Sequence, residues 1–225
     1  METNIPAEPF GFPRDGVMAV HDSALVIVDM QHDFCSPGGY WSSIGGDPAV
    51  LAAPIPAIAR ALAAARGAGL HIVHTRVGRR ADVLDADPEG RRHAQPSGGG
   101  EAGELGRHLV RGEPGWQIVE PLAPAPGETV IDKPATGAFH ATDLDHVLRA
   151  RGVQNLIVCG VTTAICVSTT VREASDRGYD VLVLGDACAE GDPAMHRAAL
   201  ETFMLEDGVF AAVTTADAFV YALAR

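Results

Sequence analysis

The sequence has 225 residues, of which 47% are hydrophobic, and its formal net charge is −12. This length suits one α/β domain or two small ones and is sufficient to bury a sizeable core. The acidic balance argues against nucleic acid or an anionic membrane as a partner, because both bind clustered cations. The first residues include acidic side chains and no apolar run, so we expect no signal peptide, and no stretch is expected to reach membrane-span length.

The four cysteines are Cys35, Cys159, Cys166 and Cys188, and none forms a CxxC pair. Three of them flank apolar runs, where buried free thiols are common. The cysteine pattern therefore favours a reduced, cytoplasmic protein.

Strand-like and helix-like segments alternate along the chain after an N-terminal arm at residues 1–22. Short apolar runs predict strands at 24–30, 70–75, 128–132, 155–159, 180–184 and 209–213. Helical spacing and capping residues predict helices at 47–68, 141–151, 165–177, 192–206 and 216–224. This alternation predicts an α/β fold in a single domain over residues 23–225: a doubly wound, six-stranded parallel sheet with helices on both faces.

A long polar stretch from 77 to 115 interrupts the alternation. It begins with a pair of arginines, Arg79 and Arg80, and contains three consecutive glycines at 98–100. A structureless stretch of this length inside a compact domain is usually functional. We therefore interpret it as a lid or an insertion.

Three apolar runs, far apart in the sequence, lead to an ionisable or nucleophilic residue. One ends at Asp29, one ends at Lys133, and the third precedes the segment that contains Cys166. Buried parallel strands read as short apolar runs, and open α/β sheets place their active sites beyond the carboxyl ends of the strands. An acid, a cation and a thiol at one sheet edge predict nucleophilic catalysis by the cysteine.

Each of these three residues also has an ordinary structural interpretation. Asp29 suits a helix cap or loop anchor, Lys133 a strand-end cation, and Cys166 a buried structural thiol. The place of Cys166 near the start of a predicted helix favours catalysis, because the N–H groups there stabilise a thiolate. The occurrence of all three at strand ends is more specific than any one of them.

Three segments resemble a known superfamily: residues 24–34 (ALVIVDMQHDF), 130–134 (VIDKP) and 160–172 (GVTTAICVSTTVR). From about residue 23 onward the sequence resembles the cysteine hydrolases of the isochorismatase-like superfamily. The resemblance implies an isochorismatase-like, Rossmann-like fold, a catalytic triad of Asp29, Lys133 and Cys166, and no cofactor. It also implies a cis peptide between Val161 and Thr162 that turns backbone N–H groups towards the oxyanion.

The implied reaction is hydrolysis of a C–N bond through a thioester. Asp29 takes the proton of Cys166, Lys133 stabilises the negative charge, and the thiolate attacks a carbamoyl carbon. Asp29 then protonates the departing amine and later activates water against the thioester, so that ammonia is released.

Within the superfamily the sequence looks most like the biuret hydrolases, on stretches that include 111–116 (RGEPGW) and 208–210 (GVF). This implies a small linear ureide of the biuret or triuret type as substrate. The alternative is a ureidoacrylate or N-carbamoyl amino acid amidohydrolase, and a non-catalytic member of the fold is less favoured. Two positions depart from the pattern: Ala164 replaces an acidic or polar residue, and Glu206 stands where a glutamine fits.

Five residues are candidates for the substrate pocket: Phe34, Arg76, Trp116, Phe139 and Glu206. Aromatic rings are suited to wall a small planar substrate, although such rings are more often part of the core. Arg76 is suited to bind a carboxylate, with a solvated charge as the ordinary alternative, whereas Glu206 would oppose a carboxylate.

No metal site is expected. Nicotinamidases of the superfamily have an Asp-x-His…His zinc cluster, whereas His71 and His74 are three positions apart and would face opposite sides of a strand. The resemblance also implies a homo-oligomer, either a dimer or a tetramer.

Overall fold

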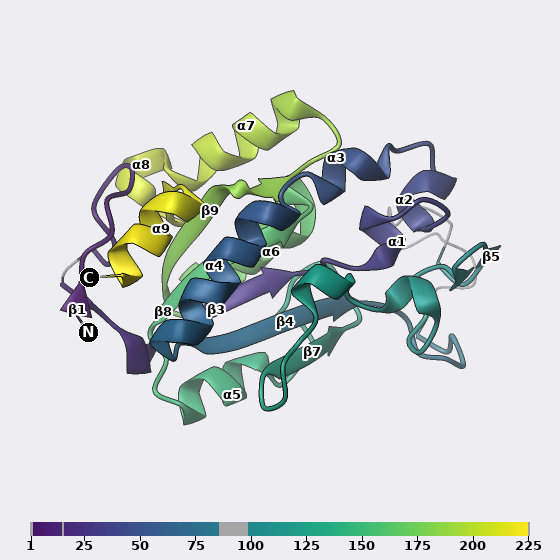
Figure 1. Ribbon diagram of the computed structural model, residues 1–225, viewed down its shortest axis with the longest axis horizontal. Helices are drawn as coiled ribbons and strands as arrows, with labels where there is room; N and C mark the ends of the chain where they lie inside the picture. Colours follow the sequence, from purple (N-terminus) through teal and green to yellow (C-terminus); the bar gives the residue numbers. More distant parts are fainter. Residues whose placement is uncertain (1, 15, 86–98, 225) are drawn as a thin grey trace.

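The computed structural model describes residues 2–14, 16–85 and 99–224. Its centre is a six-stranded sheet in the order β10-β9-β8-β3-β4-β7, with every neighbouring pair parallel (Figure 1). The strands in chain order are β3 (Ser23–Val28), β4 (His71–Val77), β7 (Thr129–Lys133), β8 (Asn155–Val161), β9 (Asp180–Ala189) and β10 (Ala212–Thr214). The predicted six-stranded parallel sheet is confirmed. All of β3 is buried, as expected for an interior strand with helices on both faces.

The helices cover the sheet on both faces. α4 (Ile55–Ala68) and α9 (Ala216–Leu223) pack against each other on one face (Figure 1). The connection through α4 leads from β3 towards the β7 edge of the sheet. Three later connections lead the other way, towards the β10 edge, and they contain α5 (Leu144–Ala150), α6 (Ser168–Asp176) and α7 (Pro193–Phe203). Right-handed crossovers therefore place these three helices on the other face. The short α8 (Leu205–Gly208) follows α7.

The segment predicted as one helix, residues 47–68, forms two helices. α3 (Pro48–Ala52) ends before Pro54, and α4 begins after it, because proline lacks an N–H and clashes with the preceding turn. By length and composition Pro48–Ala68 is apolar enough to cross a membrane, which corrects the expectation that no stretch reaches that length. In the fold, Ile58 and Leu62 of this segment are buried in the core.

Two short helices, α1 (His32–Cys35) and α2 (Tyr40–Ser43), follow β3 and were not expected. The buried carboxylate of Asp33 holds this region together. It accepts hydrogen bonds from the N–H of Tyr40 at 3.1 Å and from the N–H of Leu109 at 2.8 Å. Burial raises the pKa of Asp33, and these two donors oppose that shift. The contact with Leu109 ties the 77–115 insertion to the carboxyl edge of the sheet.

The described parts of the 77–115 insertion are ordered on this edge. β5 (Ala102–Gly103) pairs with β6 (Gly106–Arg107), and Arg79 forms backbone hydrogen bonds with Leu109 and Arg111. The short helices η2 (Pro114–Trp116) and η3 (Glu120–Leu122) lead on to β7. The middle of the expected lid, residues 86–98, lies outside the described residues.

The N-terminal arm is more than an irregular surface segment. β1 (Glu2–Thr3) pairs with β2 (Met18–Ala19), and η1 (Val20–Asp22) leads into β3. Ile5, Phe12 and Met18 have no exposed surface. The described part of the arm therefore adds apolar side chains to the core, which its irregular sequence pattern did not indicate.

Candidate functional site

The sheet brings the three predicted catalytic residues to one edge. Asp29 directly follows β3, Lys133 is the last residue of β7, and Cys166 follows β8. β3 pairs with both β4 and β8, and β4 pairs with β7, so these three carboxyl ends lie at the same edge. Parallel pairing thus brings Asp29 to the same edge as two residues that follow it by more than a hundred positions.

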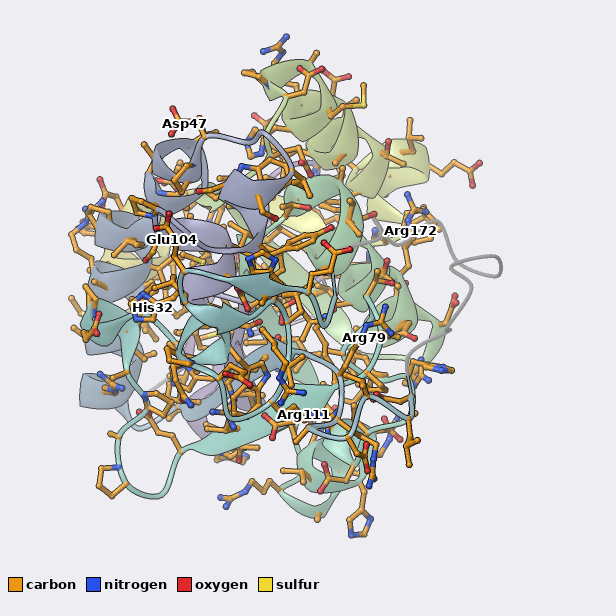
Figure 2. All side chains as sticks on the ribbon, turned by 90° about the vertical axis from the view of Figure 1, so that its right-hand side faces the viewer. His32, Asp47, Arg79, Glu104, Arg111 and Arg172 are labelled. Atoms are coloured by element: carbon orange, nitrogen blue, oxygen red, sulfur yellow. The ribbon has the colours of Figure 1, made fainter. Side chains whose placement is uncertain are left out.

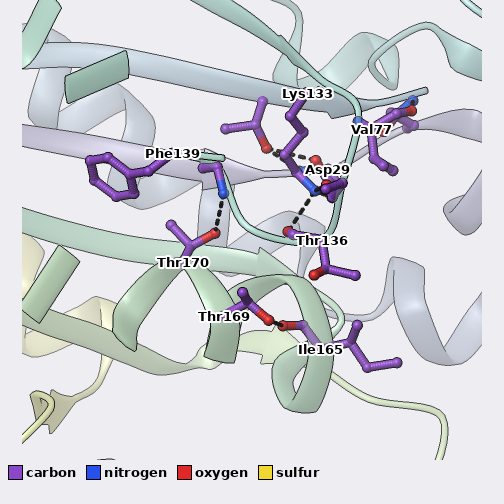
Figure 3. A network of polar contacts seen from close by, with 12 residues as sticks. Asp29, Val77, Lys133, Thr136, Phe139, Ile165, Thr169 and Thr170 are labelled. Carbon is purple, nitrogen blue, oxygen red and sulfur yellow. Dashed lines mark hydrogen bonds and ion pairs between the residues drawn. The ribbon is translucent and has the colours of Figure 1, made fainter. Parts of the chain in front are cut away.

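Asp29 and Lys133 form a buried ion pair. Lys133 Nζ lies 2.8 Å from Asp29 Oδ2, and neither side chain has exposed surface. The same ammonium donates to the carbonyl oxygens of Ala135 at 2.9 Å and Thr136 at 2.8 Å (Figure 3). Lys133 is also the only lysine in the sequence. A buried ammonium with this set of acceptors is held rigidly in one place.

Thr75 of β4 orients the Asp29 carboxylate. Its hydroxyl donates to Asp29 Oδ1 at 2.6 Å, and the N–H of Asp29 is directed back at the Thr75 hydroxyl and carbonyl oxygens, both at 3.2 Å. Asp29 adopts a left-handed backbone with φ of 50°, which turns the chain out of the strand. Sequence reasoning missed Thr75, because a threonine inside a strand has the pattern of ordinary β structure.

Cys166 lies in η4 (Thr163–Val167), a π-helical turn that precedes α6. The residue is only 8% exposed, and both Asp29 and Lys133 act electrostatically on its thiol. Burial raises the pKa of Cys166 to about 12, although the Lys133 ammonium opposes that shift. The resting thiol is therefore protonated at neutral pH, and it needs a base beside it to become a nucleophile.

The electrostatics assign the base. Burial by itself lowers the pKa of Lys133, but its interactions with Asp29 and Cys166, the charge of Asp29 first among them, outweigh burial and the net pKa is raised. Lys133 therefore remains an ammonium and has no lone pair with which to accept a proton. This leaves the carboxylate of Asp29 as the group in contact with the thiol that is able to take its proton.

The backbone before the nucleophile has the expected special geometry. The peptide between Val161 and Thr162 is cis. Around the turn, the N–H of Ala164 donates to Glu190 Oε2 at 3.0 Å, and Thr163 Oγ1 lies 2.8 Å from His196 Nδ1. A carboxylate from the end of β9 thus lies beside Ala164, the position at which an acidic or polar residue was expected.

Arg76 and Trp116 lie together, away from Lys133. In β4 and β7, Arg76 is paired with Asp132 and Val77 is paired with Lys133, so Arg76 points to the opposite face of the sheet from the lysine. The Arg76 guanidinium pairs with Asp132 at 2.8 Å and lies 3.6 Å from the Trp116 ring centroid. The charge of Arg76 is therefore already paired, and its expected role in binding a carboxylate stays a prediction.

Two other candidates for the pocket point away from the triad. The Phe139 ring lies 5.8 Å from that of Tyr179 and extends away from Asp29 and Lys133 (Figure 3). Glu206 lies beside Asp207, which Arg14 joins to the start of β9 at Asp180, on the amino edge of the sheet. Phe139 and Glu206 therefore do not face the triad of the same chain, and their role in substrate binding stays a prediction. Sequence patterns placed both residues near motifs without giving the direction of their side chains.

Phe34 and the two strand histidines have structural neighbours. The Phe34 ring packs edge-on against Tyr40 with centroids 6.2 Å apart, and its role in substrate binding stays a prediction. His74 is fully buried and bonds to Glu128 Oε2 at 3.0 Å, while His71 lies 3.2 Å from the Thr129 hydroxyl. Burial lowers the pKa of both histidines.

Arginines are present on the carboxyl edge of the sheet. Figure 2, which views this edge, shows Arg79, Arg111 and Arg172 on this side of the molecule. Arg111 donates to the carbonyl oxygens of Gly78 at 3.0 Å and Asp132 at 3.4 Å, and among the described residues no carboxylate pairs with it. Its position next to the end of β7 places an uncompensated positive charge near Lys133. The sequence analysis used Arg111 only as part of the 111–116 stretch and gave it no role in the site.

A family model for the isochorismatase domain matches residues 23–218. The chain belongs to the isochorismatase family. Its relatives include the ureidoacrylate amidohydrolase RutB of Azorhizobium caulinodans, which is 36% identical over 186 residues and covers 80% of this chain and 82% of that protein. RutB of Cronobacter turicensis is 38% identical over 200 residues, covering 85% of this chain and 86% of the relative.

Solved structures of the family have the same fold. A cysteine hydrolase from Pseudomonas syringae pv. phaseolicola has a TM-score of 0.78 and 30% identity, covering 92% of this chain and 94% of that one. N-carbamoylsarcosine amidase from Thermoplasma acidophilum has a TM-score of 0.65 and 28% identity, covering 87% and 97%. The chain is an amidohydrolase of this family, and these names match the alternative expectation better than the biuret hydrolase.

Proposed function

We propose that the protein hydrolyses the carbamoyl C–N bond of a small ureido acid of the ureidoacrylate type. The observation that carries this proposal is the buried Asp29–Lys133 pair, both members of which act electrostatically on the Cys166 thiol. The names of the relatives supply the substrate class: ureidoacrylate and N-carbamoylsarcosine each combine a carbamoyl group on nitrogen with a carboxylate.

The proposed reaction starts with a proton transfer. Asp29 takes the proton of the Cys166 thiol as the sulfur attacks the carbamoyl carbon, because a thiol whose pKa is about 12 is not ionised beforehand. Lys133 balances the negative charge that builds up on the sulfur and the substrate. Backbone N–H groups around Thr162 and Cys166 bind the oxyanion of the tetrahedral intermediate, and one such donor is typically worth about 3–4 kcal/mol.

Collapse of the intermediate breaks the C–N bond. The protonated Asp29 gives its proton to the departing nitrogen, and an S-carbamoyl thioester remains on Cys166. Asp29 then takes a proton from water as the hydroxide attacks the thioester, and the sulfur leaves and regains its proton. The products are the amine and carbamic acid, which breaks down to ammonia and carbon dioxide.

A substrate carboxylate requires a cation near the pocket. We propose Arg111 for this role, because its described acceptors are carbonyl oxygens, and a guanidinium binds a carboxylate through two parallel hydrogen bonds. Arg76 and Arg80 do not fit this role, because Asp132 and Asp82 already pair with them.

The proposal is tested by ammonia release from ureidoacrylate, N-carbamoylsarcosine, biuret, triuret and nicotinamide. We expect kcat/KM to be highest for ureidoacrylate or N-carbamoylsarcosine, and to fall below detection in Cys166→Ala for every substrate. Cys35→Ala, which alters another buried thiol, is the matched control and should retain activity. Preference for biuret over both carboxylates would reject the proposed substrate class, and wild-type activity in Cys166→Ala would reject the mechanism.

We propose a homo-oligomer, a dimer or a tetramer, that acts on a small molecule without nucleic acid or a membrane as partner. All four cysteines are free thiols, which supports the proposed cytoplasmic location.

A further inference from the structure

The loop after Lys133 holds the lysine ammonium through two of its carbonyl groups. Lys133 Nζ donates to the carbonyl oxygens of Ala135 and Thr136 at 2.9 and 2.8 Å. These acceptors lie only two and three residues beyond the lysine, in a segment outside any helix or strand. They fix the ammonium only while the loop itself is held in place. The position of Nζ therefore depends on what anchors this loop.

The anchors come from the helix that follows the nucleophile. Thr170 Oγ1 accepts from the N–H of Ala138 at 3.1 Å (Figure 3). Glu173 Oε2 accepts from the N–H of Phe139 at 3.1 Å. Thr170 and Ala138 have no exposed surface, so water does not compete for this hydrogen bond. The Glu173 carboxylate also lies directly over Gly137, so a Cβ at this position would force that carboxylate to move.

Helical spacing explains why the thiol and both anchors face the same loop. Thr170 and Glu173 follow Cys166 by four and seven positions, and side chains at this spacing lie on one face of a helix. The adjacent Thr169 differs, because its hydroxyl donates to the carbonyl oxygen of Ile165 in its own turn at 2.8 Å (Figure 3). The continuous helical segment of η4 and α6 thus carries the Cys166 sulfur and, through the loop, positions the Lys133 ammonium.

We propose that Thr170 and Glu173 are positioning residues that set the distance between the Lys133 ammonium and the Cys166 sulfur. Through the amides of Ala138 and Phe139 they hold the loop carbonyls, and these hold Nζ. The catalytic meaning of this distance rests on the proposed function. The position of the ammonium, however, is a property of the folded protein that is measurable without any substrate.

The experiment compares Thr170→Val with the matched control Thr169→Val. Because Lys133 is the only lysine, protein labelled with ¹⁵Nζ-lysine gives a single side-chain NMR signal. We expect Thr170→Val to shift or broaden this signal, and Thr169→Val to leave it unchanged. Thr170→Ser, which keeps the acceptor oxygen, should restore the wild-type signal.

A second readout is the rate at which iodoacetamide alkylates Cys166 at pH 8, followed by mass spectrometry of the peptide. A displaced ammonium stabilises the thiolate less, so we expect the rate in Thr170→Val to fall about tenfold, as for the loss of about one pKa unit of stabilisation. In the hydrolysis assay, kcat should fall by a similar factor with KM unchanged.

Glu173 supplies an independent test if Thr170→Val does not fold. Glu173→Gln keeps an acceptor for the Phe139 N–H and should behave as wild type, whereas Glu173→Ala should reproduce the loss. An unchanged lysine signal and alkylation rate in folded Glu173→Ala and Thr170→Val would overturn the proposal, as would equal effects in Thr169→Val. Absence of ureide hydrolysis by the wild type would reject the proposed function instead, because neither the NMR nor the alkylation readout uses a substrate.

Discussion

The Lys133 ammonium lies 2.8 Å from Asp29 Oδ2, and both side chains are completely buried. Two opposite charges removed from water together tolerate burial that neither would tolerate alone. The pair also separates the roles of its members. In the proposed reaction, the ammonium provides fixed positive charge beside Cys166, and the carboxylate acts as the base.

The pair predicts a specific pattern of stability changes. Lys133→Met leaves the Asp29 charge buried without a counter-ion, so we expect the free energy of unfolding to fall by about 3–5 kcal/mol, together with loss of hydrolysis. The double variant Asp29→Asn/Lys133→Met removes both charges and should recover part of the stability but none of the activity. Urea denaturation and ammonia release measure these two properties. Additive losses in the double variant would contradict the pairing.

Thr75 is predicted to act through Asp29. Thr75→Val preserves the shape of the side chain but removes the hydroxyl that donates to Asp29 Oδ1 at 2.6 Å. Since a hydrogen bond to a charged group contributes about 1.5–3 kcal/mol, we expect kcat to fall by about tenfold to a hundredfold, with a smaller change in KM. Steady-state kinetics check this, and Thr75→Ser is the control that should restore the rate. A Thr75→Val enzyme with wild-type kcat would remove Thr75 from the site.

The buried thiol predicts a steep pH dependence of alkylation. Because burial raises the pKa of Cys166 to about 12, the thiolate fraction rises about tenfold per pH unit below that value, and we expect the alkylation rate to follow it between pH 7 and 9. Cys166 should also react before Cys159 and Cys188, which lack an ammonium partner. Mass spectrometry of the cysteine peptides measures both properties. A rate that levels off near pH 7 would mean that the thiolate is already formed at rest.

Arg111 is predicted to select carboxylated substrates. In Arg111→Gln we expect KM for ureidoacrylate to rise by about tenfold or more, because a charge-assisted pair is lost, whereas kcat/KM for uncharged biuret should be unchanged. Arg60→Gln, which removes a surface ion pair with Asp217, is the control and should affect neither substrate. Equal losses for ureidoacrylate and biuret in Arg111→Gln would assign Arg111 a structural role.

Glu128 predicts loss of stability in acid. Burial opposes its ionisation, but hydrogen bonds from Arg66, the N–H of Ala125 and His74 outweigh burial and lower its pKa from 4.5 to about 2. A depressed carboxyl pKa stabilises the fold above the unfolded value and loses that contribution as pH falls from about 5 to 2. In Glu128→Gln we expect a lower Tm at pH 7 and a weaker decline of Tm between pH 5 and 3. Parallel Tm curves for the two proteins would contradict this.

The sequence alone determined the fold class and predicted the residues of the triad. Short apolar runs are sufficient to identify buried parallel strands, and the carboxyl ends of such strands meet at one edge wherever the sheet forms. Asp29, Lys133 and Cys166 were therefore found by their positions at strand ends. The apolar spacing of residues 47–68 predicted one helix, because it did not show that Pro54 divides this segment into α3 and α4. The helices α1 and α2 were missed because they are too short to show a helical period of apolar residues.

Only the tertiary structure decided which way the surrounding side chains point. Arg76 and Lys133 are on neighbouring strands, but their registers place them on opposite faces, and a register is a property of two strands together. Thr75, Arg111 and the anchors Thr170 and Glu173 acquire their roles from partners that are distant in sequence. No local pattern encodes such pairs, because each hydrogen bond exists only once packing has brought its two ends together.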